Sequence, residues 1–236
     1  MTKFGFLNLS RPFVKVISGL ANHDLSKVIP VVVAAAEAGA HAVDVAADAE
    51  IIRWVKDNSP LAVFASGLTP AVLIEAALLG ADVVELGNFD ALYAAGGTIS
   101  AETVLNQARE IVAGLPSGVK ISVTIPGKLT VKEQLDLATQ LQAIGVHFLQ
   151  LEVLPGFVEQ AMGIAKAVVG IVEIPVILAG GITLDNIATF VETGVKGLGI
   201  GNAISSLTSE KAMTETLRAM LVKVAEVAKP SAAVGI

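Results

Sequence analysis

Eight short apolar segments recur along the chain, and longer segments with helical spacing separate them. The short segments have the length and residue types of β-strands, and they are residues 14–18, 42–46, 61–65, 83–86, 120–124, 148–152, 176–179 and 198–201. Amphipathic or apolar spacing predicts helices over residues 25–38, 70–79, 102–113, 131–144, 157–169 and 209–228. Eight strands that alternate with helices within 236 residues match the pattern of a (β/α)8 barrel.

We therefore predict one α/β domain, a (β/α)8 TIM barrel over residues 1–228, followed by a flexible C-terminal tail over 229–236. An open, doubly wound sheet is the alternative. Its dinucleotide-binding form carries the fingerprint GxGxxG after the first strand, whereas residues 18–23 read SGLANH here. The composition also fits a closed parallel sheet, because 53% of the residues are apolar and only 16% are charged.

Charge and residue usage exclude several classes of function. The chain has no cysteine, which rules out thiol nucleophiles, disulfide frameworks and cysteine-based metal clusters. A net charge of −6 and 4% aromatic residues argue against nucleic acid as the main partner. No segment has the apolar length of a membrane span or a signal peptide. We expect a soluble protein that is located in the cytoplasm or in the stroma.

A weak internal repeat sets the orientation of four strands. Each copy places a glycine before a small residue, a polar residue and an apolar strand, and the glycines are Gly39, Gly80, Gly145 and Gly194. Five residues after each glycine come Asp44, Glu85, Gln150 and Gly199. Leu149 and Leu151 flank Gln150, and large apolar residues belong under the helices, so we expect the shared position to point into the barrel.

The polar residues inside the barrel are candidates for acid–base chemistry. The same alternation points Lys15 and Ser122 inward, and it puts Glu152 one inward step above Gln150, at the carboxyl end of the barrel. Asp44, Glu85 and Glu152 are the candidate acids and bases, with Lys15 and Gln150 orienting a substrate or stabilising negative charge. In the alternative, Lys15 simply forms a buried ion pair with Asp44 or Glu85, an arrangement that disfavours a Schiff-base role.

Two glycine-rich turns follow the seventh and eighth predicted strands. The first contains Gly180 and Gly181, and the second contains Gly201 and Asn202 before a short helix. Glycine lets backbone amides approach an anion closely, and the loops after strands seven and eight form the phosphate site in many TIM barrels. We predict phosphate binding at these four residues, the alternative being that the glycines only make tight turns.

Other loops give weaker indications. Residues 87–99 form a long connection that is a candidate lid, or else contains a short helix. Lys128 is a candidate cation for a second anionic group, and His23 a candidate proton carrier, or else a residue that helps start the first helix. His41 and His147 fall at strand starts and receive no role. No metal-ligand motif or cofactor fingerprint occurs, so we predict neither a metal nor a cofactor.

Several short stretches resemble a known family. Residues 15–22, 44–46, 123–126 and 179–182 read KVISGLAN, DVA, VTIP and AGGI, and they resemble the hypothetical chloroplast open reading frame 23 family of cyanobacteria and plastids. The resemblance covers nearly the whole chain. That family continues Gln-Thr-Glu-Gly where this chain has Gln150, Leu151, Glu152 and Val153, so both polar residues stay and their neighbours change.

The last two strands also resemble phosphate-binding barrels such as ribulose-phosphate epimerase and thiamine-phosphate synthase. That resemblance implies a fold and a phosphate, not a reaction, and the second strand lacks the Asp-x-Lys pair of the related decarboxylases. We expect a cofactor-independent lyase, isomerase or synthase acting on a small phosphorylated metabolite. Two alternatives remain open: a non-catalytic sensor, in which Lys15 and the carboxylates pair with one another, and an FMN-dependent oxidoreductase. The high apolar content is compatible with a homo-oligomer.

Overall fold

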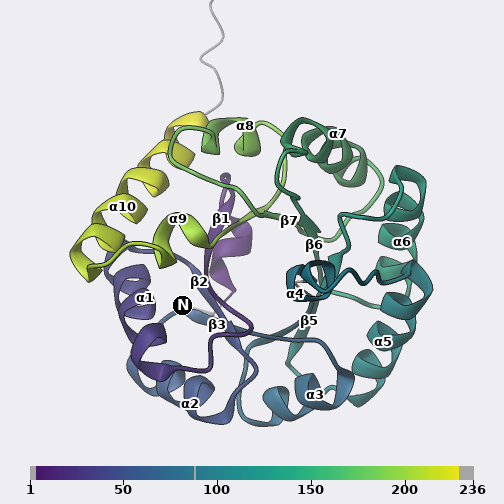
Figure 1. Ribbon diagram of the computed structural model, residues 1–236, viewed down its shortest axis with the longest axis horizontal. Coiled ribbons are helices and arrows are strands. Elements are labelled where there is room, and N and C mark those ends of the chain that lie inside the picture. The colour runs from purple at the N-terminus through teal and green to yellow at the C-terminus, as the bar shows by residue number, and fades with distance from the viewer. Residues whose placement is uncertain (1–3, 88, 229–236) are drawn as a thin grey trace, which may run out of the picture.

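A computed structural model describes residues 4–87 and 89–228, and the chain folds into a closed eight-stranded parallel barrel (Figure 1). The strands are β1 (Phe13–Gly19), β2 (Ala42–Ala46), β3 (Ala62–Gly67), β4 (Val83–Leu86), β5 (Lys120–Ile125), β6 (Phe148–Glu152), β7 (Val176–Ala179) and β8 (Gly197–Ile200). Closure comes from β8, which pairs with β1 so that Gly199 lies opposite Lys15. The predicted TIM barrel is confirmed, and the predicted tail over 229–236 lies outside the described residues.

Helices surround the barrel as an outer layer (Figure 1). They are α1 (Leu25–Ala38), α2 (Ala49–Asn58), α3 (Pro70–Leu78), α5 (Ala101–Gly114), α6 (Val131–Ala143), α7 (Val158–Val169), α8 (Ile187–Val191) and α10 (Glu210–Val227). Two short helices, α4 (Asp90–Ala94) and α9 (Asn202–Ser205), lie in the loops after β4 and β8. The connection over 87–99 therefore contains the short helix that the sequence left open. None of the described helices combines the length and the apolarity needed to cross a bilayer.

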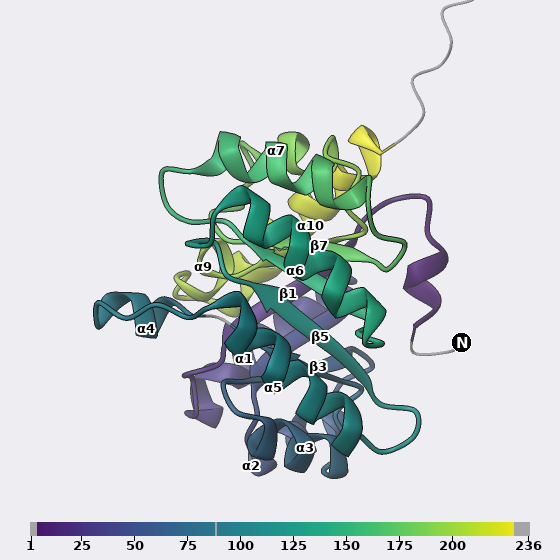
Figure 2. The ribbon, with the colours of Figure 1, turned by 90° about the vertical axis from the view of Figure 1, so that its right-hand side faces the viewer.

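An aromatic layer fills the barrel at the amino ends of the strands. The inward side chains there form a separate apolar cluster: Phe13, Ala42, Ala62, Phe64, Val83, Phe148 and Ile177. Phe6 of the 3-10 helix η1 (Gly5–Asn8) packs on this layer, with its ring centroid 4.8 Å from that of Phe13. Figure 2 shows this N-terminal segment and α4 at opposite ends of the barrel. The amino end is thus covered by apolar side chains, which directs any polar pocket to the carboxyl end.

The polar residue that lies two positions after the glycine of the internal repeat has a structural role. The Nδ1 atom of His41 accepts the amide N–H of Val14 at 3.0 Å, and Nδ1 of His147 accepts that of Ile121 at 3.3 Å. Asp82 does the same for the start of β3. Burial lowers the pKa of both histidines, which keeps the accepting nitrogen unprotonated. These side chains satisfy amides at the amino ends of the odd strands, far from the carboxyl-end loops.

Candidate functional site

The barrel interior opens at the carboxyl ends of the strands into a pocket of about 270 Å³. Strand side chains form its polar floor and wall: Asp44, Ser66, Glu85, Thr124, Gln150 and Glu152. Loops supply its rim, which includes Ser18, Gly19, Gly180, Gly181, Thr183, Gly201, Asn202 and Ser205. The pocket therefore brings together the predicted acid–base and phosphate-binding residues, with the exception of Lys15.

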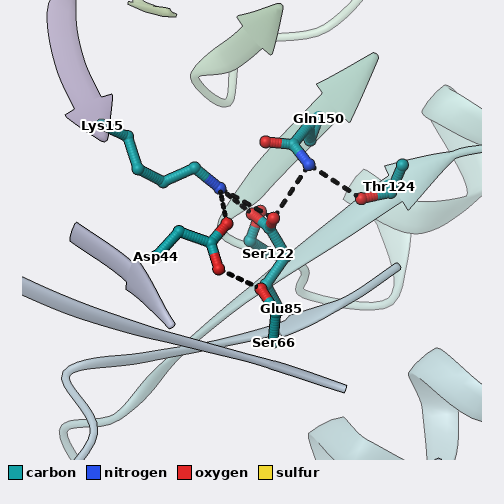
Figure 3. Close-up of polar contacts among 7 residues, drawn as sticks. All are labelled: Lys15, Asp44, Ser66, Glu85, Ser122, Thr124 and Gln150. Carbon is teal, nitrogen blue, oxygen red and sulfur yellow. Dashed lines mark hydrogen bonds and ion pairs between the residues drawn. The ribbon is translucent and has the colours of Figure 1, made fainter. Parts of the chain in front are cut away.

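Lys15 is fully buried and forms a three-residue ion-pair cluster. Its Nζ atom lies 2.8 Å from Oδ2 of Asp44 and 2.7 Å from each carboxylate oxygen of Glu85 (Figure 3). Burial alone would lower the pKa of Lys15, but the charges of the two carboxylates outweigh it and raise the pKa, so the ammonium group stays charged. The buried ion pair foreseen as an alternative is confirmed, and it includes both carboxylates.

Glu85 is the central acceptor of this cluster. Its Oε2 atom accepts the hydroxyl of Ser122 at 2.8 Å, and its Oε1 atom accepts the side-chain amide of Gln150 at 2.8 Å. Asp44 in turn accepts the hydroxyl of Ser66 at 2.5 Å. One lysine and two carboxylates leave the buried cluster one negative charge in excess, which is costly in a site withdrawn from water.

A proton on Glu85 would remove that excess charge. Burial raises the pKa of Glu85 to about 7, against the attraction of Lys15 and with the repulsion of Asp44 adding to the rise. Near neutral pH both protonation states of this carboxyl group are therefore populated. The Ser122 hydroxyl is able to serve either protonation state, because a hydroxyl both donates and accepts.

Glu152 lines the pocket above Gln150, as predicted, and it also holds two loops in place. Its Oε2 atom accepts the amide of Gly127 after β5 at 2.9 Å, and Oε1 accepts the amide of Phe89 before α4 at 3.4 Å. Its carboxylate therefore connects the α4 segment to the site. Lys128 belongs to a neighbouring groove instead, where its Nζ lies 4.3 Å from the centroid of the Tyr93 ring.

His23 also lies outside this pocket. Its side chain is exposed and its Nδ1 atom lies 3.6 Å from a carboxylate oxygen of Asp48. Neither His23 nor Lys128 contributes to the pocket wall, so their suggested ligand contacts gain no support. In the described residues, no group of three or more His, Asp or Glu side chains is placed to hold a metal ion.

The two glycine turns meet at the rim, as predicted. Gly180 and Gly181 have φ of 114° and 64°, values that favour glycine. A Cβ on Gly180 would lie 2.4 Å from the carbonyl oxygen of Val153, so this turn presses directly on the loop after β6. A Cβ on Gly181 would meet nothing within 4 Å, and one on Gly201 would have ordinary contacts with Ile17. The rim is therefore open rather than filled by bulky side chains.

Backbone amides face no acceptor at these turns. Within the described part of the chain, the backbone hydrogen bonds of the loops after β7 and β8 do not use the amides of Gly181, Ile182, Asn202 or Ala203. The amides of Asn202 and Ala203 belong to the first turn of α9, where no intrahelical acceptor exists. Unused amides beside an open rim are the donors that an oxyanion requires.

The loop after β1 also belongs to this rim, although the local sequence pattern did not predict it. Ser18 and Gly19 line the pocket, and Gly19 has a φ of 103°. The sequence indicates a turn at Ser18 and Gly19, after the first strand. These residues line the pocket only because β8 pairs with β1 and closes the barrel. Thr124, two residues after Ser122 and so on the same face of β5, also joins the wall and accepts the side-chain amide of Gln150 at 3.1 Å.

Comparisons with known proteins agree with the family resemblance drawn from the sequence. A family model described as "Protein of unknown function (DUF561)" matches residues 7–229. "Uncharacterized protein ycf23" of Cyanophora paradoxa is 32% identical over 225 residues, covering 88% of this chain and 90% of that protein. The protein of the same name from Antithamnion sp. is 30% identical over 221 residues, covering 84% and 79%.

Solved structures match the fold at low sequence identity. KGPDC from Streptococcus mutans has a TM-score of 0.69 and 17% identity, covering 92% of this chain and 99% of that one. The 3-hexulose-6-phosphate synthase from Salmonella typhimurium has a TM-score of 0.68 and 13% identity, covering 91% and 99%. At such identities the likeness establishes the shared barrel and nothing about the reaction.

Proposed function

This chain belongs to the DUF561 family, and we propose that it binds a small phosphorylated metabolite at the carboxyl end of its barrel. We further propose that it acts on this ligand as a lyase, isomerase or synthase without a cofactor. One observation carries the proposal: a single pocket joins a rim of unused backbone amides to a buried carboxyl group with a pKa of about 7. The first feature suits an anion, and the second suits proton transfer at neutral pH.

The phosphate would lie at the rim formed by Gly180, Gly181, Gly201 and Asn202. Amide donors from two loops meet there, and the side chain of Asn202 adds a further donor at the pocket edge. The same-fold 3-hexulose-6-phosphate synthase is named for a phosphorylated compound, which agrees with this placement. A phosphate at the rim leaves the rest of the ligand to extend toward the polar floor.

At the floor, Glu85 would carry the proton. A carboxyl group with a pKa of about 7 is suited both to remove a proton from the ligand and to return one. Asp44 and Glu152 also line the pocket and would serve as its acid–base partners, while Gln150 would orient the ligand. Lys15 does not line the pocket, so we assign it a positioning role: it holds the two carboxylates and offsets part of their charge.

A non-catalytic sensor of a phosphorylated ligand is the second candidate. The observation that favours it is the mutual pairing of Lys15 with Asp44 and Glu85, which gives these charges a purely structural explanation. Both candidates require phosphate binding at the rim. They differ in turnover: with an enzyme, the Glu85→Gln variant binds the ligand and no longer converts it, whereas with a sensor the unmodified protein converts nothing.

Thermal unfolding with a panel of phosphorylated metabolites and inorganic phosphate tests the binding step. A ligand at about 100 times its Kd adds about 2.7 kcal/mol of stability, a rise of several degrees in Tm for a chain of this size. The near-isosteric Asn202→Asp places a negative charge at the rim and should reduce the rise. Asn106→Asp, at an exposed position of α5, makes the same change in net charge away from the pocket and should leave the rise in Tm unchanged.

Two outcomes would contradict the binding proposal. In one, neither inorganic phosphate nor any phosphorylated compound raises Tm. In the other, Asn202→Asp and Asn106→Asp reduce the rise equally, which would indicate a general effect of charge. A yellow purified protein would favour the FMN alternative instead. A cytoplasmic or stromal location and a homo-oligomeric state remain proposals, to be tested by cell fractionation and by light scattering.

A further inference from the structure

One polar atom of the pocket wall has no partner in the protein. Gln150 is buried, with a relative exposure of 5%, and it lines the pocket. Among the described residues, its Oε1 atom is buried and receives no hydrogen bond. A buried carbonyl oxygen without a donor is unfavourable, so its retention beside a pocket needs an explanation.

The orientation of the Gln150 amide is set by its other end. Its Nε2 atom donates to Oε1 of Glu85 at 2.8 Å and to Oγ1 of Thr124 at 3.1 Å. In Figure 3 the carbonyl oxygen of Gln150 points away from both partners. A rotation of the amide by 180° would turn that oxygen toward the Glu85 carboxylate, which accepts but does not donate when ionised.

Protonation of Glu85 leaves this orientation in place. Oε2 can accommodate the proton, because the Ser122 hydroxyl at 2.8 Å can turn from donor to acceptor. Oε1 of Glu85 remains an acceptor for Gln150. The exchangeable proton of the site and the fixed amide of Gln150 are therefore compatible.

The next two strands, β7 and β8, offer Oε1 of Gln150 no side-chain donor. On the adjacent β7, the inward residues are Ile177, the register partner of Gln150, and Ala179. On β8 the inward position is Gly199, whose absent side chain leaves space that Ile17 and Ala179 occupy. All of these residues are apolar or lack a side chain, so no side chain of β7 or β8 donates to Gln150, and a ligand in the pocket can supply the missing donor.

We infer that the ligand carries a hydroxyl group that donates to Oε1 of Gln150, and hence that it is a phosphorylated polyol or sugar rather than an alkyl or acyl phosphate. This inference rests on the proposed phosphate site, which places the other end of the ligand at the rim. A hydroxyl is the simplest neutral donor, and it adds no further charge to a cluster that already has an excess of one. Gln150 is thus a specificity-determining residue for the hydroxylated part of the ligand.

Matched pairs of ligands test the inference. Alkyl phosphates and polyol phosphates with the same number of carbons, from three to five, are titrated against the protein by calorimetry, together with inorganic phosphate. We expect the polyol phosphate of at least one pair to bind about tenfold or more tightly than its alkyl counterpart, as expected for satisfying a buried acceptor. Gln150→Met, which keeps the length of the side chain, should remove that preference.

Ser122→Ala is the matched control. It removes a hydrogen bond from the same cluster, but Ser122 does not line the pocket, so the preference for the polyol phosphate should persist. If Gln150→Met does not fold, monodeoxy analogues on the unmodified protein replace it: removal of one particular hydroxyl should cost about tenfold in affinity, and removal of the others little. The side-chain amide resonance of Gln150 should move with the polyol phosphate and not with the alkyl phosphate.

The outcomes separate this inference from the proposed function. If alkyl and polyol phosphates bind equally tightly, the hydroxyl contact is wrong while the phosphate site stands. A preference that persists in Gln150→Met would equally refute the role of Gln150. If neither series nor inorganic phosphate binds, the proposed function itself has failed.

Discussion

Replacement of Glu85 by glutamine should change how the stability of this protein depends on pH. The folded-state pKa of Glu85 is about 7, against an ordinary value of 4.5, because burial disfavours its charge. A carboxyl group with a raised pKa contributes stability that is fully present below pH 4.5 and is lost as the pH rises through about 7. At about 1.4 kcal/mol per pH unit, the loss amounts to about 3 kcal/mol.

Urea unfolding of the wild type and of Glu85→Gln, from pH 4.5 to 8.5, gives this quantity as a difference curve. Glutamine has the shape of the protonated acid and no titration, so the wild type should lose about 3 kcal/mol relative to the variant across that range. Comparison with the variant is essential because His41 and His147, whose pKa values are lowered by burial, cost stability as the pH falls below 6.5. Those contributions are common to both proteins and cancel.

A flat difference curve would refute this reasoning, as would a wild type that gains stability over the variant with rising pH. Either result would mean that Lys15 holds Glu85 ionised in the folded state at all these pH values. The raised pKa of Lys15 does not interfere, because its stabilising contribution is lost only in alkaline solution above its ordinary value of 10.5. Glu85 would then be a structural counter-ion rather than a proton carrier.

Three further changes follow from the same structure. Lys15→Met leaves two buried carboxylates without their cation, so the free energy of unfolding measured in urea at pH 8 should fall by about 3–5 kcal/mol. The fall should be smaller at pH 5, because Glu85 is then protonated. In Gly180→Ala the added Cβ meets a carbonyl oxygen at 2.4 Å, so this variant should lower the free energy of unfolding by more than about 2 kcal/mol. In Gly181→Ala the added Cβ lies in open space, so this variant should cost about 1 kcal/mol. Thermal melts that rank the two variants in the opposite order would contradict the turn geometry. His41→Asn keeps a hydrogen-bond acceptor without a titration, so it should abolish part of the stability loss below pH 6.5, and an unchanged pH profile would show that His41 is protonated in the folded state.

Much of the interior could be derived from local patterns. The side chains of a strand alternate with a period of two, and the repeated glycine marks the same register in four strands, so the inward direction of Asp44, Glu85 and Gln150 followed without any tertiary information. The regular succession of eight short apolar strands and longer helical segments likewise indicated the closed barrel. The two glycine turns followed from their position after the seventh and eighth strands.

The partners of these side chains were beyond such patterns. Lys15 and Glu85 are 70 residues apart, and several pairings across the barrel were compatible with the same inward directions. Only closure of the sheet brought both carboxylates to one ammonium group, placed Gly19 of β1 beside the turn after β8, and left one oxygen of Gln150 without a donor. Local spacing decides which way a side chain points because the backbone repeat is short-ranged. Which atom it meets depends on packing between strands that are distant in the chain.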